Sequence, residues 1–152
     1  MTANAPRGYF LADEFRKRGA KVVLGGVHPT LLPEEALQHA DSVVVGEAEG
    51  VWARLLADAR LGRLAPRYHE PSPPLDEYVR IGPRQAAQKR LFNVVPIMTT
   101  RGCPYNCEFC CVHDIFGSQV RHLPVASVVR DIVDSAGRYF IFLAANIIGD
   151  AR

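Results

Sequence analysis

The chain has 152 residues, of which 48% are hydrophobic and 22% are charged, and its formal net charge is +2. This length fits one ordinary domain or two small ones, and this composition is typical of a soluble globular protein. Its basic residues are spread along the chain, so we expect no nucleic-acid-binding surface, and no apolar run reaches the ~18 residues of a transmembrane helix.

Three helices are predicted in the first part of the chain. Residues 7–18 form one helix with Leu11 and Phe15 on its apolar face, and Gly19 follows its end. A second helix begins at Pro33, with two glutamates in the first turn, where the helix dipole favours negative charge. The third helix carries an apolar stripe at helical spacing and ends at a glycine. Its stripe consists of Val51, Trp52, Leu55, Leu56 and Ala59.

Two short apolar runs, residues 22–24 and 43–45, lie between these helices, and each is followed by glycine. Continuously apolar runs of this length are typical of parallel strands that are buried on both faces. Helices and strands therefore alternate along the chain. This order predicts an α/β fold, in which residues 1–62 are part of a doubly wound domain that binds ligands at the carboxyl ends of its strands.

Residues 63–93 contain several prolines that interrupt any periodic pattern, so they are predicted to link two domains. The second domain, residues 94–152, begins with a strand at 94–98 and has a buried strand at 139–143. Strand, long loop, helix and strand match the first βαβ unit of a (β/α) barrel, which carries its chemistry in the loop after the strand. The helix has a core stripe of Val125, Val128, Val129, Ile132, Val133 and Ala136.

Cys103, Cys107 and Cys110 form a C-x3-C-x2-C pattern, called here the cysteine triplet. Thiolates are the usual ligands of iron–sulfur clusters, and four of them close a cubic [4Fe-4S] cluster. Three thiolates leave one iron with an open coordination site, at which a metal centre can carry out chemistry. The triplet therefore predicts a cluster with an open iron.

A structural zinc site is an alternative, with Cys111 or His113 as the fourth ligand. Zinc sites usually pair their ligands, with a second pair some distance away, whereas all four cysteines here lie between Cys103 and Cys111. Inert thiols are a further alternative, and a disulfide is disfavoured because nothing suggests secretion. We expect Cys111 to be a small buried residue that points away from the cluster.

The triplet, together with Phe116-Gly117 and residues 121–124 after it, resembles the radical S-adenosylmethionine (SAM) enzymes. The resemblance implies a [4Fe-4S] cluster on Cys103, Cys107 and Cys110, with SAM chelated at the open iron. It also implies that Phe109 lies beside the adenine of SAM. A loop residue that plugs the core is the alternative for Phe109.

Residues 23–30, 33–36 and 46–49 resemble the later half of the cobalamin-binding domain in B12-dependent radical SAM proteins. The resemblance implies that the backbone at Gly25 and Gly26 approaches the nucleotide tail of the cofactor. Four more residues in the same segments are candidates for contact with the cofactor. They are His28, Gly46, Glu47 and Glu49.

His28 does not match the cobalt ligand of that family, which belongs to an Asp-x-His-x-x-Gly motif that this sequence lacks. Two positions for His28 therefore remain open, one beside the cofactor and one in which it only structures its loop. Glu47 and Glu49 likewise either contact a ligand or are solvated acids at a helix start.

The resemblance implies an enzyme that cleaves SAM reductively and uses the resulting radical on a small-molecule or lipid substrate. Methyl transfer from cobalamin to an unactivated carbon of the substrate is one possible reaction. The electron that cleaves SAM would come from a flavodoxin- or ferredoxin-type donor. Many relatives carry two aspartates where this chain has Ala144-Ala145, so we expect weaker SAM binding. Both domains look incomplete, so we expect a fragment with little catalysis by itself.

Two other functions remain open. One is a module that binds a cluster or cobalamin without turnover, and the other is a zinc-stabilised interaction domain. The N-terminus has no signal-peptide pattern, and clustered free cysteines suit a reducing compartment, so a cytoplasmic location is predicted. We expect no transmembrane segment.

Overall fold

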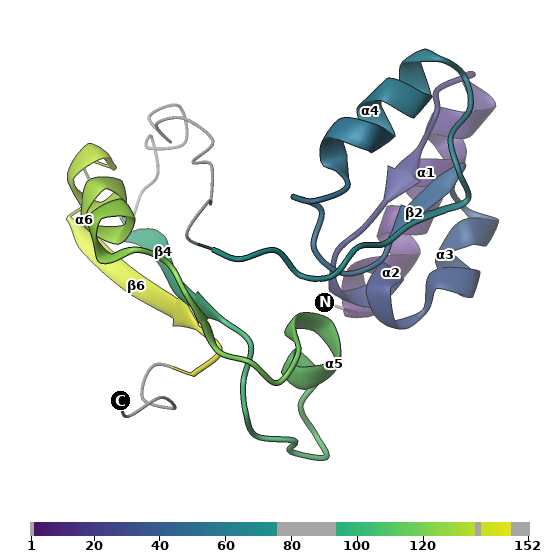
Figure 1. The fold of residues 1–152 in the computed structure, drawn as a ribbon. Coiled ribbons are helices and arrows are strands. Elements are labelled where there is room, and N and C mark those ends of the chain that lie inside the picture. The colour runs from purple at the N-terminus through teal and green to yellow at the C-terminus, as the bar shows by residue number, and fades with distance from the viewer. Residues whose placement is uncertain (1, 76–93, 136–137, 147–152) are drawn as a thin grey trace. The chain divides into compact units, whose positions relative to one another are not determined.

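The computed structural model describes residues 2–75, 94–135 and 138–146. The chain divides into two compact units, Met1–Pro73 and Pro74–Arg152, and the described residues of each contain a three-stranded sheet (Figure 1). Both units mix helices with strands, so the prediction of an α/β fold is confirmed at this level. Among the described residues, no helix is both long and apolar enough to span a membrane.

The sheet of the first unit is parallel and has the order β1-β2-β3. Its strands are β1 (Val23–Leu24), β2 (Ser42–Val44) and β3 (Arg67–Tyr68). The central strand β2 is buried along its whole length, as its apolar sequence predicts. Because all three strands run the same way, their carboxyl ends lie at one edge of the sheet.

Helices cover both faces of this sheet. They are α1 (Ala5–Lys17), which follows the 3-10 turn Thr2–Asn4, then α2 (Val27–Leu31), α3 (Pro33–Gln38) and α4 (Trp52–Arg60). Alternate side chains of β2 point to opposite faces. Val43 packs in one cluster with α1 and α3, through Tyr9 and Ala36, whereas Val44 packs in a second cluster with Leu55 of α4.

The buried face of α1 differs from the predicted one. Leu11 and Phe15 are exposed, and the helix buries Tyr9 and Ala12 instead. Tyr9 belongs to the core cluster of Val43, and its ring stacks on His39 with centroids 4.3 Å apart. The end of the helix is as predicted, because Gly19 has a φ of +83° and closes α1 with the hydrogen bonds of a Schellman motif.

The apolar stripe of α4 is half buried, because Leu55 and the preceding Val51 lie in the core while Trp52 and Leu56 are exposed.

The predicted linker is also wrong at its start, because β3 adds a third strand to the sheet. Tyr68 of β3 is almost fully buried, and its hydroxyl donates to Asp58 at 2.9 Å. A two-residue strand has no period that a sequence could reveal. Residues 76–93 of the predicted linker lie outside the described residues.

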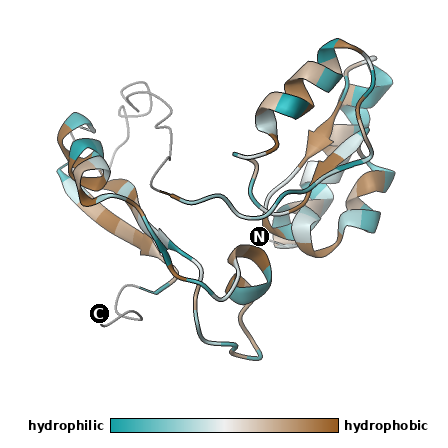
Figure 2. Ribbon diagram, viewed as in Figure 1, coloured by the Kyte–Doolittle hydropathy of each residue, from teal (hydrophilic) through white to brown (hydrophobic). Residues whose placement is uncertain are grey.

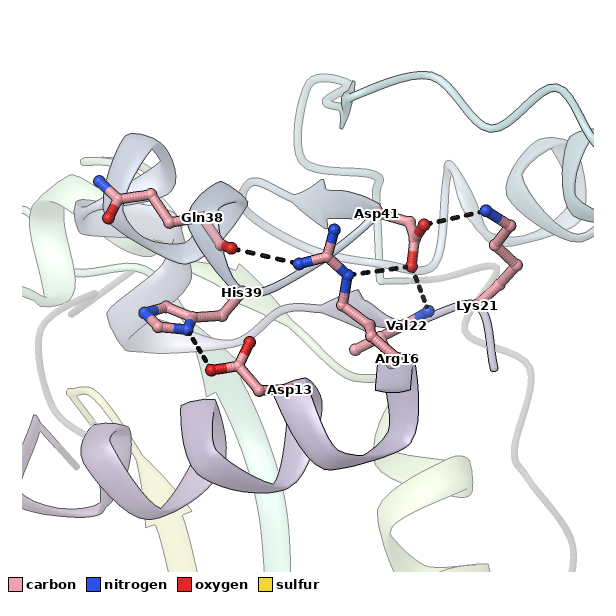
Figure 3. A network of polar contacts seen from close by, with 7 residues as sticks. All are labelled: Asp13, Arg16, Lys21, Val22, Gln38, His39 and Asp41. Atoms are coloured by element: carbon pink, nitrogen blue, oxygen red, sulfur yellow. Dashed lines mark hydrogen bonds and ion pairs between the residues drawn. The ribbon is translucent and has the colours of Figure 1, made fainter. Parts of the chain in front are cut away.

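Asp41 joins α1 to the start of β1 in a network of polar contacts (Figure 3). The backbone N–H of Val22 donates to its Oδ2 at 2.9 Å, Lys21 Nζ lies 3.0 Å from Oδ1, and Arg16 Nε lies 3.6 Å from Oδ2. The Val22 N–H, and then Lys21 and Arg16, hold the pKa of the Asp41 carboxyl below its ordinary value of 3.8. The ionised carboxylate therefore stabilises the folded state.

Replacing Asp41 with asparagine should lower the free energy of unfolding of the first unit by roughly 1–3 kcal/mol at neutral pH. The folded-state pKa lies below the unfolded one, so this stabilisation is complete above the unfolded pKa and is lost as pH falls through the folded pKa. The difference between Asp41→Asn and the unchanged protein should therefore shrink below about pH 4. Urea unfolding followed by the fluorescence of Trp52, the single tryptophan, would measure it. A difference that stays constant down to pH 2 would contradict the assignment.

The second unit has a mixed sheet of order β5-β4-β6. Its strands are β4 (Val94–Arg101), β5 (Arg121–His122) and β6 (Tyr139–Ala144), and its helices are α5 (Val112–Phe116) and α6 (Val125–Asp134). β4 pairs parallel with β6 and antiparallel with β5. The sequence predicted β4, α6 and β6, but it predicted neither α5 nor β5, which are too short to show a period.

The apolar residues of α6 and β6 are less buried than predicted. Val125, Val129 and Val133 of α6 are exposed, and Ala136 of the predicted stripe lies outside the described residues. Most side chains of β6 are exposed as well, although hydrophobic colour runs along this strand (Figure 2). Helix α6 contacts β4, and one helix cannot cover a whole sheet.

Candidate functional site

The cysteines lie in a loop, residues 102–120, called here the cysteine loop, that leaves the carboxyl end of β4 and returns through β5. Gly102 opens it with a φ of +88°, and a side chain at this position would overlap the carbonyl oxygen of Gln119. Next to it, the backbone N–H of Cys103 donates to the carbonyl of Gly117 at 3.2 Å. The two ends of the loop are therefore held together backbone to backbone.

An irregularity in β4 precedes the loop. The register of β4 with β6 shifts between Met98 and Thr100, which leaves Thr99 as an extra residue. The carbonyl of Thr99 accepts a hydrogen bond from the N–H of Leu123 at 2.9 Å, on the returning side of the cysteine loop. Bulges of this kind re-aim the side chains that follow and are frequent beside active sites.

The four thiols are free and differ in exposure. Cys103 is buried, Cys110 is half-buried, and Cys107 and Cys111 are exposed. The exposure of Cys111 contradicts the prediction of a small buried residue. Its carbonyl accepts from Ile115 at the start of α5, and that residue, not Cys111, fills the core beneath the helix.

Among the residues that the structure describes, no three cysteine, histidine or acidic side chains converge on a position for one metal ion. A cubic cluster binds each cysteine to a separate iron. The chemistry of three free thiols in one loop with closed ends is that of the donor set such a cluster uses.

Two further residues of the loop have unusual surroundings. Phe109 is 93% exposed, so it does not plug the core, and its ring is available to a ligand. His113 Nδ1 is buried, and within the described part of the chain it has no hydrogen-bond partner. A buried polar atom in this situation costs stability unless a further group satisfies it. The loop therefore offers a flat aromatic ring and an unsatisfied nitrogen close to the thiols in sequence.

In the first unit, the predicted glycines lie at the carboxyl edge of the parallel sheet. Gly25 and Gly26 follow β1, and Gly26 has a φ of +94° that starts α2. Gly46 lies just beyond β2 with a φ of +82°, and its N–H donates to Thr30 Oγ1 at 3.0 Å. That hydrogen bond joins the loop after β2 to helix α2. The structure thus brings together two residues that are 16 positions apart in sequence.

His28 lines a cavity of about 290 Å³ at this edge, together with Tyr9, Gly25 and the first residues of α1. Its Nε2 lies 3.3 Å from Glu35 Oε1, and its ring centroid lies 5.9 Å from that of Tyr9. Burial raises the pKa of the Tyr9 phenol, which therefore stays protonated at neutral pH. His28 is thus held by its neighbours and also borders a space that a ligand could enter.

Two acidic residues follow β2, and they differ in burial. Glu47 is buried at 6% exposure, which contradicts a solvated position, whereas Glu49 is exposed.

His69, which the sequence did not single out, lies beside Gly46, and its Nδ1 is 3.1 Å from the carbonyl oxygen of Val45. His69 follows β3, so recognising that strand was the signal that would have found it.

No protein-family model matches the chain. It is 42% identical over 149 residues to a bacteriochlorophyllide d C-8(2)-methyltransferase of Chlorobaculum tepidum, a match that covers 91% of this chain and 32% of the relative. It is 32% identical over 139 residues to a bacteriochlorophyllide d C-12(1)-methyltransferase of the same organism, covering 86% and 30%. An uncharacterised methyltransferase of Pyrococcus horikoshii is also 32% identical, over 134 residues, covering 73% and 29%. The chain thus spans about a third of the length of the curated methyltransferases that it matches.

Proposed function

We propose that this chain carries the cluster loop and part of the cofactor site of a cobalamin-dependent radical SAM methyltransferase. The observation that carries the proposal is the cysteine triplet in a loop with closed ends, directly after the carboxyl end of β4. The similarity to curated methyltransferases supports it. On this proposal, residues 94–152 begin the barrel, and the first unit is the later part of the cobalamin-binding domain.

Cys103, Cys107 and Cys110 would hold a [4Fe-4S] cluster. When bound, such a cluster supplies one electron, received from a flavodoxin- or ferredoxin-type donor, for reductive cleavage of SAM. Gly102 lets the loop close around the thiols, and the exposed ring of Phe109 offers an apolar surface for the adenine of SAM.

Gly25, Gly26, Gly46 and His28 would border the nucleotide tail of cobalamin at the carboxyl edge of the first sheet. The glycines offer backbone without side chains, and the cavity beside His28 provides space for part of a ligand. Glu47 is buried at the same edge and would orient this backbone rather than face solvent.

The substrate class that we put first is a chlorophyll-type tetrapyrrole, because two of the relatives are named for bacteriochlorophyllide d. Other small molecules and lipids with an unactivated carbon are the competing classes. Ala144 and Ala145 favour a second candidate function, a module that binds a cluster without turnover, because alanine side chains cannot hydrogen-bond to SAM.

Oxygen-free reconstitution of the whole protein that contains this chain, with iron and sulfide, tests the proposal, because the chain by itself is expected to show little catalysis. We expect a brown protein with iron and sulfide bound, which forms 5′-deoxyadenosine from SAM when dithionite is added. A colourless protein that retains zinc would overturn the cluster assignment. A brown protein that forms no 5′-deoxyadenosine would overturn the enzyme assignment and support the non-catalytic module.

A further inference from the structure

The last two cysteines of the triplet lie at the two ends of a tight turn. The backbone N–H of Cys110 donates to the carbonyl of Cys107 at 3.0 Å, and Glu108 and Phe109 form the middle of the turn. In a four-residue turn of this kind, the first and last Cα atoms lie less than about 7 Å apart. A disulfide usually joins Cα atoms about 4.4–6.8 Å apart, so the turn brings these two cysteines into the range that a disulfide spans.

Small oxidants in solution have access to this turn. Cys107 and the two residues after it are exposed, and Cys110 is half-buried. Cys103, the remaining cysteine of the triplet, is buried, and its N–H donates to Gly117 at the returning end of the loop. An oxidant therefore meets Cys107 first, and Cys110 is the cysteine that the turn joins to it.

Cys111 is also exposed, but the backbone disfavours it as a partner. It is adjacent to Cys110, and the Cα atoms of neighbouring residues lie about 3.8 Å apart, which is too close for an unstrained disulfide. Its carbonyl accepts the N–H of Ile115 at 3.2 Å, so it belongs to the start of α5 and not to the turn. The structure thus favours one pair among the four thiols. That pair has the C-x-x-C spacing of redox-active dithiols.

We propose that Cys107 and Cys110 form a reversible disulfide when no cluster is bound to the cysteine triplet. This inference rests on the proposed function, because it makes the disulfide an alternative state of the cluster site. A sulfur that is bonded to another sulfur has no thiolate to offer to iron, so the cluster and the disulfide exclude each other. Transient disulfides of this kind occur in reducing compartments as redox-sensing devices.

Glutathione disulfide is the class of oxidant that the step requires. The Cys107 thiolate attacks one of its sulfurs, which forms a mixed disulfide and releases one glutathione. The Cys110 thiolate then attacks the Cys107 sulfur of the mixed disulfide and releases the second glutathione. The protein loses two electrons and two protons, and both pass to the two glutathione thiols. A dithiol reductant reverses the step and returns both thiols to the cluster site.

Alkylation mapping of the whole protein that contains this chain tests the inference. The metal-free protein is treated with glutathione disulfide without oxygen, and its free thiols are then alkylated and located by peptide mass spectrometry. We expect alkyl labels at Cys103 and Cys111 and a disulfide between Cys107 and Cys110. Prior reduction with dithiothreitol should lead to labels on all four. Proteolysis after Glu108 cuts the turn between the paired cysteines, so the two peptides should stay joined only in the oxidised protein.

Matched serine variants identify the pair. Cys107→Ser and Cys110→Ser should each lower the yield of this disulfide at least about tenfold, whereas Cys111→Ser is the control and should keep it. Labels on all four thiols after oxidation, or a disulfide through Cys103 or Cys111, would overturn the inference and leave the proposed function intact.

Protein reconstituted with iron and sulfide should resist the same oxidant, since its sulfurs are bound to iron. A Cys107–Cys110 disulfide in protein that keeps its full iron content would overturn the mutual exclusion. Failure of the proposed function has a different signature, in which the disulfide forms but the reduced protein binds no iron or sulfide. That result would overturn the disulfide as an alternative state of a cluster site.

Discussion

Replacing Cys107 with alanine should abolish the formation of 5′-deoxyadenosine and remove most of the iron from the reconstituted protein. The proposed cluster has three protein ligands, so the loss of one leaves too few thiolates to hold the cube. Cys107 is exposed, and removing an exposed thiol costs little folding free energy. Iron content, visible absorbance and product formation under anaerobic conditions would measure the effect, and we expect product at the level of a reaction without protein.

Cys111→Ala is the matched control, because Cys111 is also exposed and lies one residue beyond the triplet. This variant should keep both its iron and its activity. The pair of variants also separates the cluster from a zinc site. If Cys111 were the fourth ligand of a zinc ion, both alanine variants would lose metal. Equal losses in Cys107→Ala and Cys111→Ala would therefore count against a three-cysteine cluster.

Replacing Gly102 with alanine should prevent the cysteine loop from closing and cause loss of most bound iron. The new methyl group would overlap the carbonyl oxygen of Gln119, and backbone atoms on both sides leave little room to adjust. We expect overpacking to destabilise the loop by roughly 1–3 kcal/mol beyond the cost of a positive φ. Hydrogen exchange over residues 94–124 should show lost protection at the N–H of Cys103, which donates to Gly117 in the closed loop.

Gly117→Ala distinguishes the steric overlap from backbone strain. Gly117 lies in the same loop with a φ of +79°, but a side chain there would meet no atom within 4 Å. Both variants carry the strain of a positive φ, which costs about 1–3 kcal/mol. Only Gly102→Ala adds the collision with Gln119. If the two variants bind the same amount of iron, the close contact at Gly102 does not control closure of the loop.

Elements with a strong local signal were predicted well from the sequence. The run at residues 43–45 became the buried central strand β2, offset by one residue, and Gly19 ends α1 with the positive φ that its position indicated. The buried face of α1 was predicted wrongly, because Leu11 and Phe15 are the larger apolar residues. The contacts of α1 with the rest of the unit decided which face is buried, and the stacking of Tyr9 on His39 is one of them.

The sequence by itself determined the identity and spacing of the three thiols, on which the proposed cluster depends. The tertiary structure decided the rest of the candidate site. It brought Gly46 to helix α2, which holds His28, buried Glu47, and set Arg101 opposite Arg121. These relations depend on strand pairing and on chain segments that meet in space, and strands of two residues, such as β3 and β5, carry no periodic pattern from which their partners could be inferred.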